Sequence, residues 1–173
     1  MNKNRIILYS AAIIAVFAML FYLEDPSPKL RSEARQFTRQ YEGEKGFAII
    51  KMPDFLMNEV LPESDSAGIK KENFKSFRVM IFHQDDVTAH SCRETEQAMR
   101  SFLDSMEFRQ IVEKEADANR MMRIFEKEKT GSWKENVTLF SSDSTLFMFN
   151  YISNLKQDEL ETFSRQLGHR EFL

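Results

Sequence analysis

The side chains with the most chemical potential lie close together between His83 and Glu94. Residues 83–86 read HQDD and residues 90–94 read HSCRE. Imidazole, thiolate and carboxylate groups are the ligands that Zn²⁺ takes in proteins. The spacing matches no usual zinc signature, however, and Ser91 followed by Glu94 has the pattern of a helix capping box. A solvated loop and cap is therefore the favoured interpretation, and we assign no metal ligand and no cofactor.

Cys92 is the only cysteine of the chain, so no intrachain disulfide can form. A thiol at a helix start has a lowered pKa, and His83 or His90 could then act as its base. No cysteine-hydrolase signature flanks the residue, and single free cysteines usually fill cores. We keep a Cys/His-dependent enzyme as the least favoured alternative, and we assign no catalytic residue.

An aromatic stripe follows the last predicted strand, where Phe147, Phe149 and Tyr151 alternate with residues of the opposite face. If helices cover only one face of the sheet, these rings need a ligand or a partner to cover them. If the strand is central and covered on both sides, they are core. The central strand is favoured, and Phe147, Phe149 and Tyr151 are retained as a possible interaction surface.

The stretch from Ile6 to Leu23 contains no charged residue. As a helix it would be about 27 Å long, close to the roughly 30 Å of a bilayer core. Lys3 and Arg5 precede it, which indicates a cytoplasmic N-terminus. The alternative is a signal peptide that is cleaved before secretion, although the small residues lack the spacing of a cleavage site.

This segment defines the expected domain organisation. Residues 1–5 form a cytoplasmic N-terminus, residues 6–23 a single-pass transmembrane signal-anchor, and residues 24–29 a linker with two prolines. Residues 30–173 then form one extracytoplasmic, periplasmic domain held at the inner (cytoplasmic) membrane.

The composition limits the functions open to that domain. The 16 phenylalanines and 10 methionines supply ample core material, and the net charge is −3. Because nucleic-acid binding needs a basic stripe, we expect no nucleic-acid partner.

Hydrophobic periodicity predicts the order of the elements. Helices are expected at 30–42, 53–60, 91–106 and 154–167, ending at Gly43 or Gly46 in the first case and at Gly168 in the last. Strands are expected at 47–51, 77–82, 110–114, 121–127, 133–140 and 145–152. The predicted class is α+β, an antiparallel or mixed sheet of about five to six strands with helices mainly on one face, preceded by the transmembrane helix.

The local sequence resembles the DUF4252 family of bacterial exported envelope domains of unknown function, from about Phe37 to Phe163. The resemblance lies in Phe37 with Tyr41-Glu42-Gly43, in FAIIKM at 47–52 leading into FLM at 55–57, in FRV at 77–79 and in the final hairpins. It implies an exported protein, often with a lipobox cysteine. No cysteine lies near this N-terminus, so residues 6–23 would replace the lipid anchor. The family supplies no activity or site residues.

These observations together predict a membrane-anchored envelope protein, most simply a non-enzymatic protein-interaction domain. Its expected partner is another envelope protein or a second copy of itself. The alternative is a domain that binds a lipid or an apolar small ligand.

Overall fold

The computed structural model describes residues 31–52, 69–85, 90–117 and 120–169. The segments 6–23 and 53–60, predicted as a transmembrane helix and a second helix, lie outside these ranges. No helix within them is both long and apolar enough to cross a membrane. The chain divides into residues 1–31 and 32–173, and the fold below is that of the second unit.

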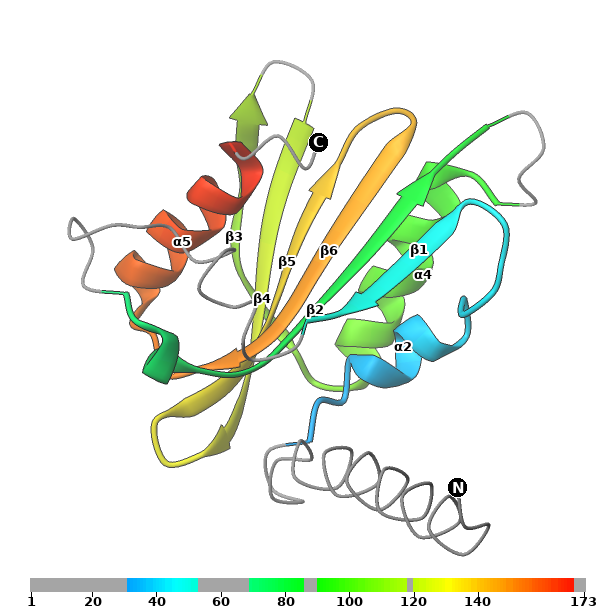
Figure 1. Ribbon diagram of the computed structural model, residues 1–173. Helices are drawn as coiled ribbons and strands as arrows, with labels where there is room; N and C mark the ends of the chain where they lie inside the picture. Colours follow the sequence, from blue (N-terminus) through cyan, green and yellow to red (C-terminus); the bar gives the residue numbers. More distant parts are fainter. Residues whose placement is uncertain (1–30, 53–68, 86–89, 118–119, 170–173) are drawn as a thin grey trace, which may run out of the picture. The chain divides into compact units, whose positions relative to one another are not determined.

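Six strands form one antiparallel sheet in the order β1-β2-β6-β5-β4-β3 (Figure 1). Their bounds are β1 Phe47–Lys51, β2 Phe74–His83, β3 Arg109–Asp117, β4 Arg120–Thr130, β5 Trp133–Ser141 and β6 Thr145–Ser153. The four strands from β3 to β6 form a meander, and β6 then pairs with β2. The predicted α+β class is confirmed, and the structure selects the antiparallel sheet from the predicted antiparallel or mixed alternatives.

The described helices are α2 (Arg35–Arg39), α4 (Cys92–Ser105), α5 (Gln157–His169) and the short 3₁₀ helix η3 (Lys71–Asn73). They serve two separate cores, because successive residues of a strand face opposite sides of the sheet. Met148 packs with Phe37 of α2 and Met99 of α4. Phe149 packs with Phe163 of α5 on the other face. The expectation of helices mainly on one face is therefore incomplete, since α5 covers part of the opposite face.

The start of α4 follows its sequence signal. The amide of Glu94 donates to Ser91 Oγ at 3.2 Å, and the amide of Ser91 donates to Glu94 Oε2 at 3.1 Å. This reciprocal pair is the predicted capping box. The buried side of the helix carries Cys92, Thr95, Met99 and Leu103.

Gly168 does not end α5 as predicted, because the helix continues to His169. A Cβ atom at position 168 would lie 2.6 Å from Cε1 of Phe140. The glycine is needed where the helix lies close to the sheet, a reason that sequence periodicity does not reveal.

Candidate functional site

The structure places Cys92 in the core rather than in an open site. Its side chain is 2% exposed, and Sγ donates to the carbonyl oxygen of Ser142 at 3.3 Å. Burial, with the carboxylates of Glu96 and Asp143 adding to it, raises the pKa of the Cys92 thiol to about 11. The thiol is thus protonated at neutral pH, the opposite of an activated nucleophile.

The two histidines near Cys92 have different surroundings. His83 Nδ1 lies 3.3 Å from Oγ1 of Thr145. The ring of His90 packs edge-on against Tyr41 and Phe47, at centroid distances of 5.7 and 5.9 Å. Within the described ranges, no three His, Cys, Asp or Glu side chains are placed to share a metal ion.

The aromatic stripe of β6 lies inside the domain. Phe147, Phe149 and Tyr151 are 6%, 2% and 0% exposed. Tyr151 stacks on Phe77 at 5.5 Å and meets the edge of Phe163 at 5.3 Å. The arrangement is that of a central strand covered on both sides, and the three rings are core side chains in this chain.

A strip of polar side chains crosses the α2 side of the sheet over four neighbouring strands. It runs from Arg78 on β2 through Asn150 on β6 and Glu135 on β5 to Lys127 and Lys129 on β4. Arg78 is opposite Asn150 in the strand register, and Glu135 is opposite Lys127. Both ends are charged, but only one end has balanced charges.

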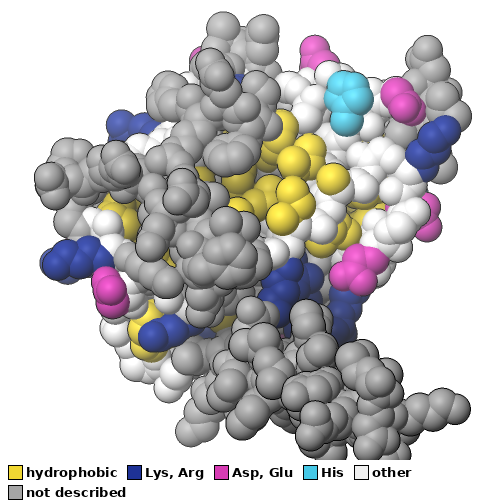
Figure 2. Space-filling model, in the orientation of Figure 1, with side chains coloured by type: hydrophobic (Ala, Val, Ile, Leu, Met, Phe, Trp, Pro, Cys, Tyr) yellow, Lys and Arg dark blue, Asp and Glu magenta, His cyan; other side chains and the backbone are white. Residues whose placement is uncertain are grey.

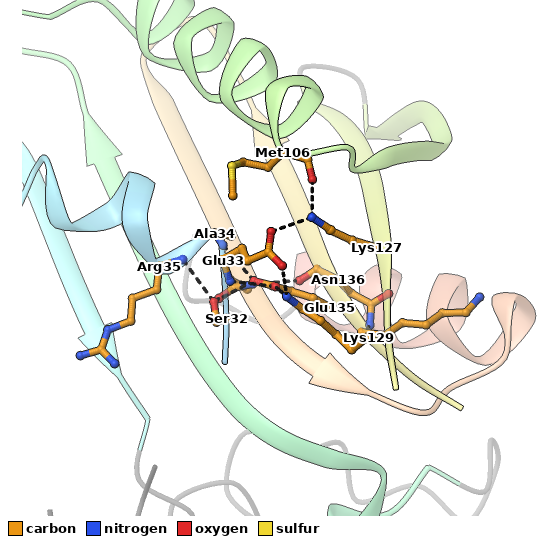
Figure 3. A network of polar contacts seen from close by, with 11 residues as sticks. Ser32, Glu33, Ala34, Arg35, Met106, Lys127, Lys129, Glu135 and Asn136 are labelled. Atoms are coloured by element: carbon orange, nitrogen blue, oxygen red, sulfur yellow. Dashed lines mark hydrogen bonds and ion pairs between the residues drawn. The ribbon is translucent and has the colours of Figure 1, made fainter. Parts of the chain in front are cut away.

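Glu135 is the centre of the balanced end and is 0% exposed (Figure 3). Its carboxylate accepts hydrogen bonds from the backbone amides of Glu33 and Ala34, both at 2.9 Å, and from Ser32 Oγ at 2.7 Å. Lys129 Nζ lies 2.8 Å from the same carboxylate. The first residues of the domain are therefore attached to the middle of the sheet by one buried side chain.

Glu33 completes this network by bridging two lysines. Lys127 Nζ lies 2.6 Å and Lys129 Nζ 2.7 Å from its carboxylate oxygens. Partial burial acts to raise the pKa of Glu33, but the bonds from both lysines outweigh it and hold the pKa below its ordinary value. Two carboxylates thus match two ammonium groups. We call Ser32, Glu33, Lys127, Lys129 and Glu135 the N-terminal clamp.

The carboxylate of Glu135 is not accessible to a substrate. A general base must reach a substrate proton directly or through one water. The oxygens of Glu135 are instead occupied by groups of the chain itself, and its side chain has no exposed surface. The arrangement positions the chain and does not present a reactive group.

The two edges of the sheet differ in their protection. The edge strand β3 carries the sequence RQIVEKEAD, whereas β1 reads FAIIK and has no charge before Lys51. Charged side chains on an edge discourage pairing with another chain. Ile50 of β1 is 47% exposed, and it is the one exposed large hydrophobic side chain among the described residues.

Neighbouring side chains extend this exposed position into a patch. Ala48 is exposed on the same face of β1, and the half-buried Ile81 of β2 is directly opposite it in the register. Figure 2 shows hydrophobic side chains gathered over the region where Figure 1 draws β1, β2 and β6. We call Ala48, Ile50 and Ile81 the β1 edge surface.

A cavity of about 270 Å³ lies between the β3–β4 hairpin and the end of α5. Its lining combines three cations with one carboxylate and apolar side chains. These residues are Lys114, Glu115, Ala116, Arg120, Met122, Phe140, Arg165 and Gly168.

Sequence reasoning did not identify the clamp or the β1 edge surface. The available signals were the lone Arg78 within the apolar run at 77–82 and the contrast between the mostly apolar run at 47–51 and the charged run at 109–117. Neither signal shows which residues meet across the sheet. Comparison with protein-family models, with curated proteins and with solved structures gave no match to this chain.

Proposed function

We propose that this chain is a membrane-anchored envelope protein that acts as an interaction domain without catalysis of its own. Residues 6–23 would hold it in the inner membrane, and the domain that begins near residue 30 would contact its partner outside the cytoplasm. The observation that carries the proposal is the exposure of Ile50 on an edge strand whose one charged residue, Lys51, lies at its end.

An unprotected edge strand leaves a sheet open to pairing with another chain. An edge strand presents unpaired backbone groups, and natural proteins usually protect such strands with charged residues, prolines or bulges. The chain places charged residues along the whole of β3 but leaves β1 apolar from Phe47 to Ile50. Addition of a partner strand to β1 would satisfy backbone groups and bury Ile50 in one step.

A second copy of the chain is the simplest occupant of the β1 edge surface. Antiparallel pairing of two β1 strands around Ile49, the central residue of β1, would bring both copies of Ile50 and Ala48 into contact across a two-fold axis. Anchoring both chains to one membrane would favour this encounter by confining them. A different envelope protein that supplies the strand is the alternative partner.

Photo-crosslinking in intact cells tests the proposal with the full-length protein. A photoreactive phenylalanine analogue is placed at Ile50, and the matched control is placed at the exposed Glu115 of the opposite edge. We expect a self-adduct from position 50 and none from position 115. A single reproducible envelope protein captured from position 50 alone would keep the function and change the partner. Equal labelling from both positions would contradict the proposal.

The cavity beside α5 favours a second candidate function, binding of an amphipathic small molecule or lipid. Met122 and Phe140 line the cavity with apolar groups, while Lys114 and Arg165 bring two cations that share one carboxylate partner, Glu161. Native mass spectrometry of the purified full-length protein should detect a retained anionic amphiphile, and Ala116→Phe should remove it by filling the space. A protein without any retained small molecule would leave the interaction domain as the only candidate.

A further inference from the structure

Arg78, at the unbalanced end of the polar strip, bonds to α2, the helix that carries Arg35 and Arg39. Arg78 is 8% exposed, and its Nη1 donates one long hydrogen bond of 3.4 Å to Thr38 Oγ1 of α2. Arg35 and Arg39 lie one helical turn apart in α2. Within the described part of the chain, no carboxylate forms an ion pair with any of the three. We call Arg35, Arg39 and Arg78 the arginine cluster.

Arg35 contributes an unsatisfied donor to this cluster. Its Nε atom is buried and has no hydrogen-bond partner among the described residues. Figure 3 shows its side chain pointing away from the clamp, while its backbone amide donates to Ser32 Oγ at 3.1 Å. The backbone of Arg35 is fixed by the clamp, whereas Nε of its guanidinium has no acceptor among the described residues.

The electrostatics of Arg78 agree with an accumulation of positive charge. Its burial, and then the neighbouring charges of Arg35 and Arg39, lower the pKa of Arg78, and the Glu42 carboxylate opposes them. The clamp shows that acidic side chains are available where the fold needs them, since Lys127 and Lys129 each have a carboxylate partner. The arginine cluster differs because its charge is not matched.

We propose that the arginine cluster binds a phosphate group. Guanidinium groups offer paired N–H donors whose geometry fits phosphate oxygens, and charge-assisted bonds of this kind are the strong ones. A bound phosphate would supply Arg35 Nε and the nearly buried Arg78 with acceptors and would neutralise the concentrated charge. The protein as a whole is acidic, with a net charge of −3, so this cluster is not part of a general basic surface.

The chain length indicates the source of the phosphate. Residues 24–34 separate the predicted membrane segment from Arg35, and fully extended they reach at most about 40 Å. The cluster would thus remain near the membrane surface, where phospholipid headgroups are the most concentrated phosphate. This assignment to a lipid rests on the membrane anchor of the proposed function; the phosphate site itself does not.

Thermal unfolding of the full-length protein in uncharged detergent micelles tests the site. Trp133, the single tryptophan, reports unfolding by fluorescence. We compare phosphatidylglycerol, diacylglycerol with the same acyl chains and no phosphate, and inorganic phosphate against chloride at equal ionic strength. We expect phosphatidylglycerol to raise Tm by about 3 °C or more and diacylglycerol to leave it unchanged.

The variants assign the effect to the cluster. Arg35→Gln with Arg39→Gln should abolish the rise in Tm, whereas Arg93→Gln with Arg100→Gln, which removes two exposed arginines from α4, should retain it. Arg78→Lys keeps the charge and loses the paired donors, so it should lower the apparent affinity at least tenfold.

Each outcome decides between the sources or against the site. An arginine-dependent rise with inorganic phosphate equal to that with phosphatidylglycerol would support the phosphate site and assign it to free phosphate. A rise that persists in Arg35→Gln with Arg39→Gln, or no rise with either phosphate compound, would overturn the proposal. Crosslinking at position 50 uses other residues, so failure of one proposal leaves the other intact.

Discussion

The Nζ atom of Lys129 lies 2.8 Å from Oε2 of Glu135, and the two side chains are 6% and 0% exposed. Such a pair gives little net stability compared with apolar residues, because desolvation of both charges offsets their attraction. The pair instead positions the backbone, since the same carboxylate also accepts hydrogen bonds from the amides of Glu33 and Ala34. The pair therefore determines where the N-terminal residues of the domain meet the sheet.

Removal of Glu135 should strongly destabilise the domain. Glu135→Ala leaves Lys129 buried without one of its carboxylates and strands two backbone amides, so we expect a loss of about 3–5 kcal/mol in the free energy of unfolding. Urea unfolding followed by Trp133 fluorescence measures it. Glu115→Ala, at an exposed position of β3, should change the same quantity by less than about 0.5 kcal/mol. A loss below about 1 kcal/mol for Glu135→Ala would show that the clamp is not cooperative.

Stability should fall at alkaline pH because of Tyr151. Burial raises the pKa of its hydroxyl from 10.0 to about 12, even though bonds with Ser164 and Thr138 act in the other direction. Since the folded pKa is higher, the unfolded state loses its proton first, and stability decreases from pH 10 through about pH 12. The total loss is about 3 kcal/mol for this group.

The variant Tyr151→Phe separates this titration from general alkaline unfolding. The substitution should lower the free energy of unfolding by only about 1 kcal/mol at pH 7, because Thr138 and Ser164 still hydrogen-bond to each other at 3.0 Å. Its stability should then fall less steeply than that of the native protein between pH 10 and pH 12. Identical slopes in urea titrations across this range would rule out Tyr151 as the source.

Gly168→Ala should destabilise the protein despite the better helix propensity of alanine. The propensity gain is about 1 kcal/mol, whereas overpacking against the Phe140 ring costs about 1–3 kcal/mol. Phe140→Leu creates space at this contact, so Gly168→Ala should be less harmful in that background. A double-mutant cycle of unfolding free energies measures the coupling, and a coupling near zero would show that the helix shifts instead.

Ile50→Lys should weaken association through the β1 edge surface without harming the fold. A lysine on an edge strand opposes strand addition, and the position is already half exposed. We expect a dimer fraction at least tenfold lower by light scattering of the full-length protein in detergent, with a change in unfolding free energy within about 0.5 kcal/mol. Glu115→Lys on β3 is the control, and equal dimer fractions in both variants would argue against the edge.

The local elements were largely predictable because their signals are local. Strand β1 has the predicted bounds, and the capping box of Ser91 and Glu94 starts α4 as expected. Helix α2 is shorter than the predicted 30–42, since Glu33 and Ala34 form a bend and a turn whose backbone amides bond to Glu135 instead. Hydrophobic periodicity could not show this, because the competing bonds come from a residue about one hundred positions away.

The sequence by itself determined an α+β domain with an antiparallel or mixed sheet, and the alternation that divides the residues of β6 between two faces. Only the tertiary structure decided that α5 covers the face of Tyr151, that Cys92 is a protonated core thiol and that Glu135 meets Lys129 and the start of the domain. The physical reason is that periodicity reports whether a side chain is buried, whereas charge pairing and pKa depend on which distant groups surround it. For the same reason, the sequence does not show that the two arginines of α2 lie near Arg78, where their positive charges are not matched by carboxylates.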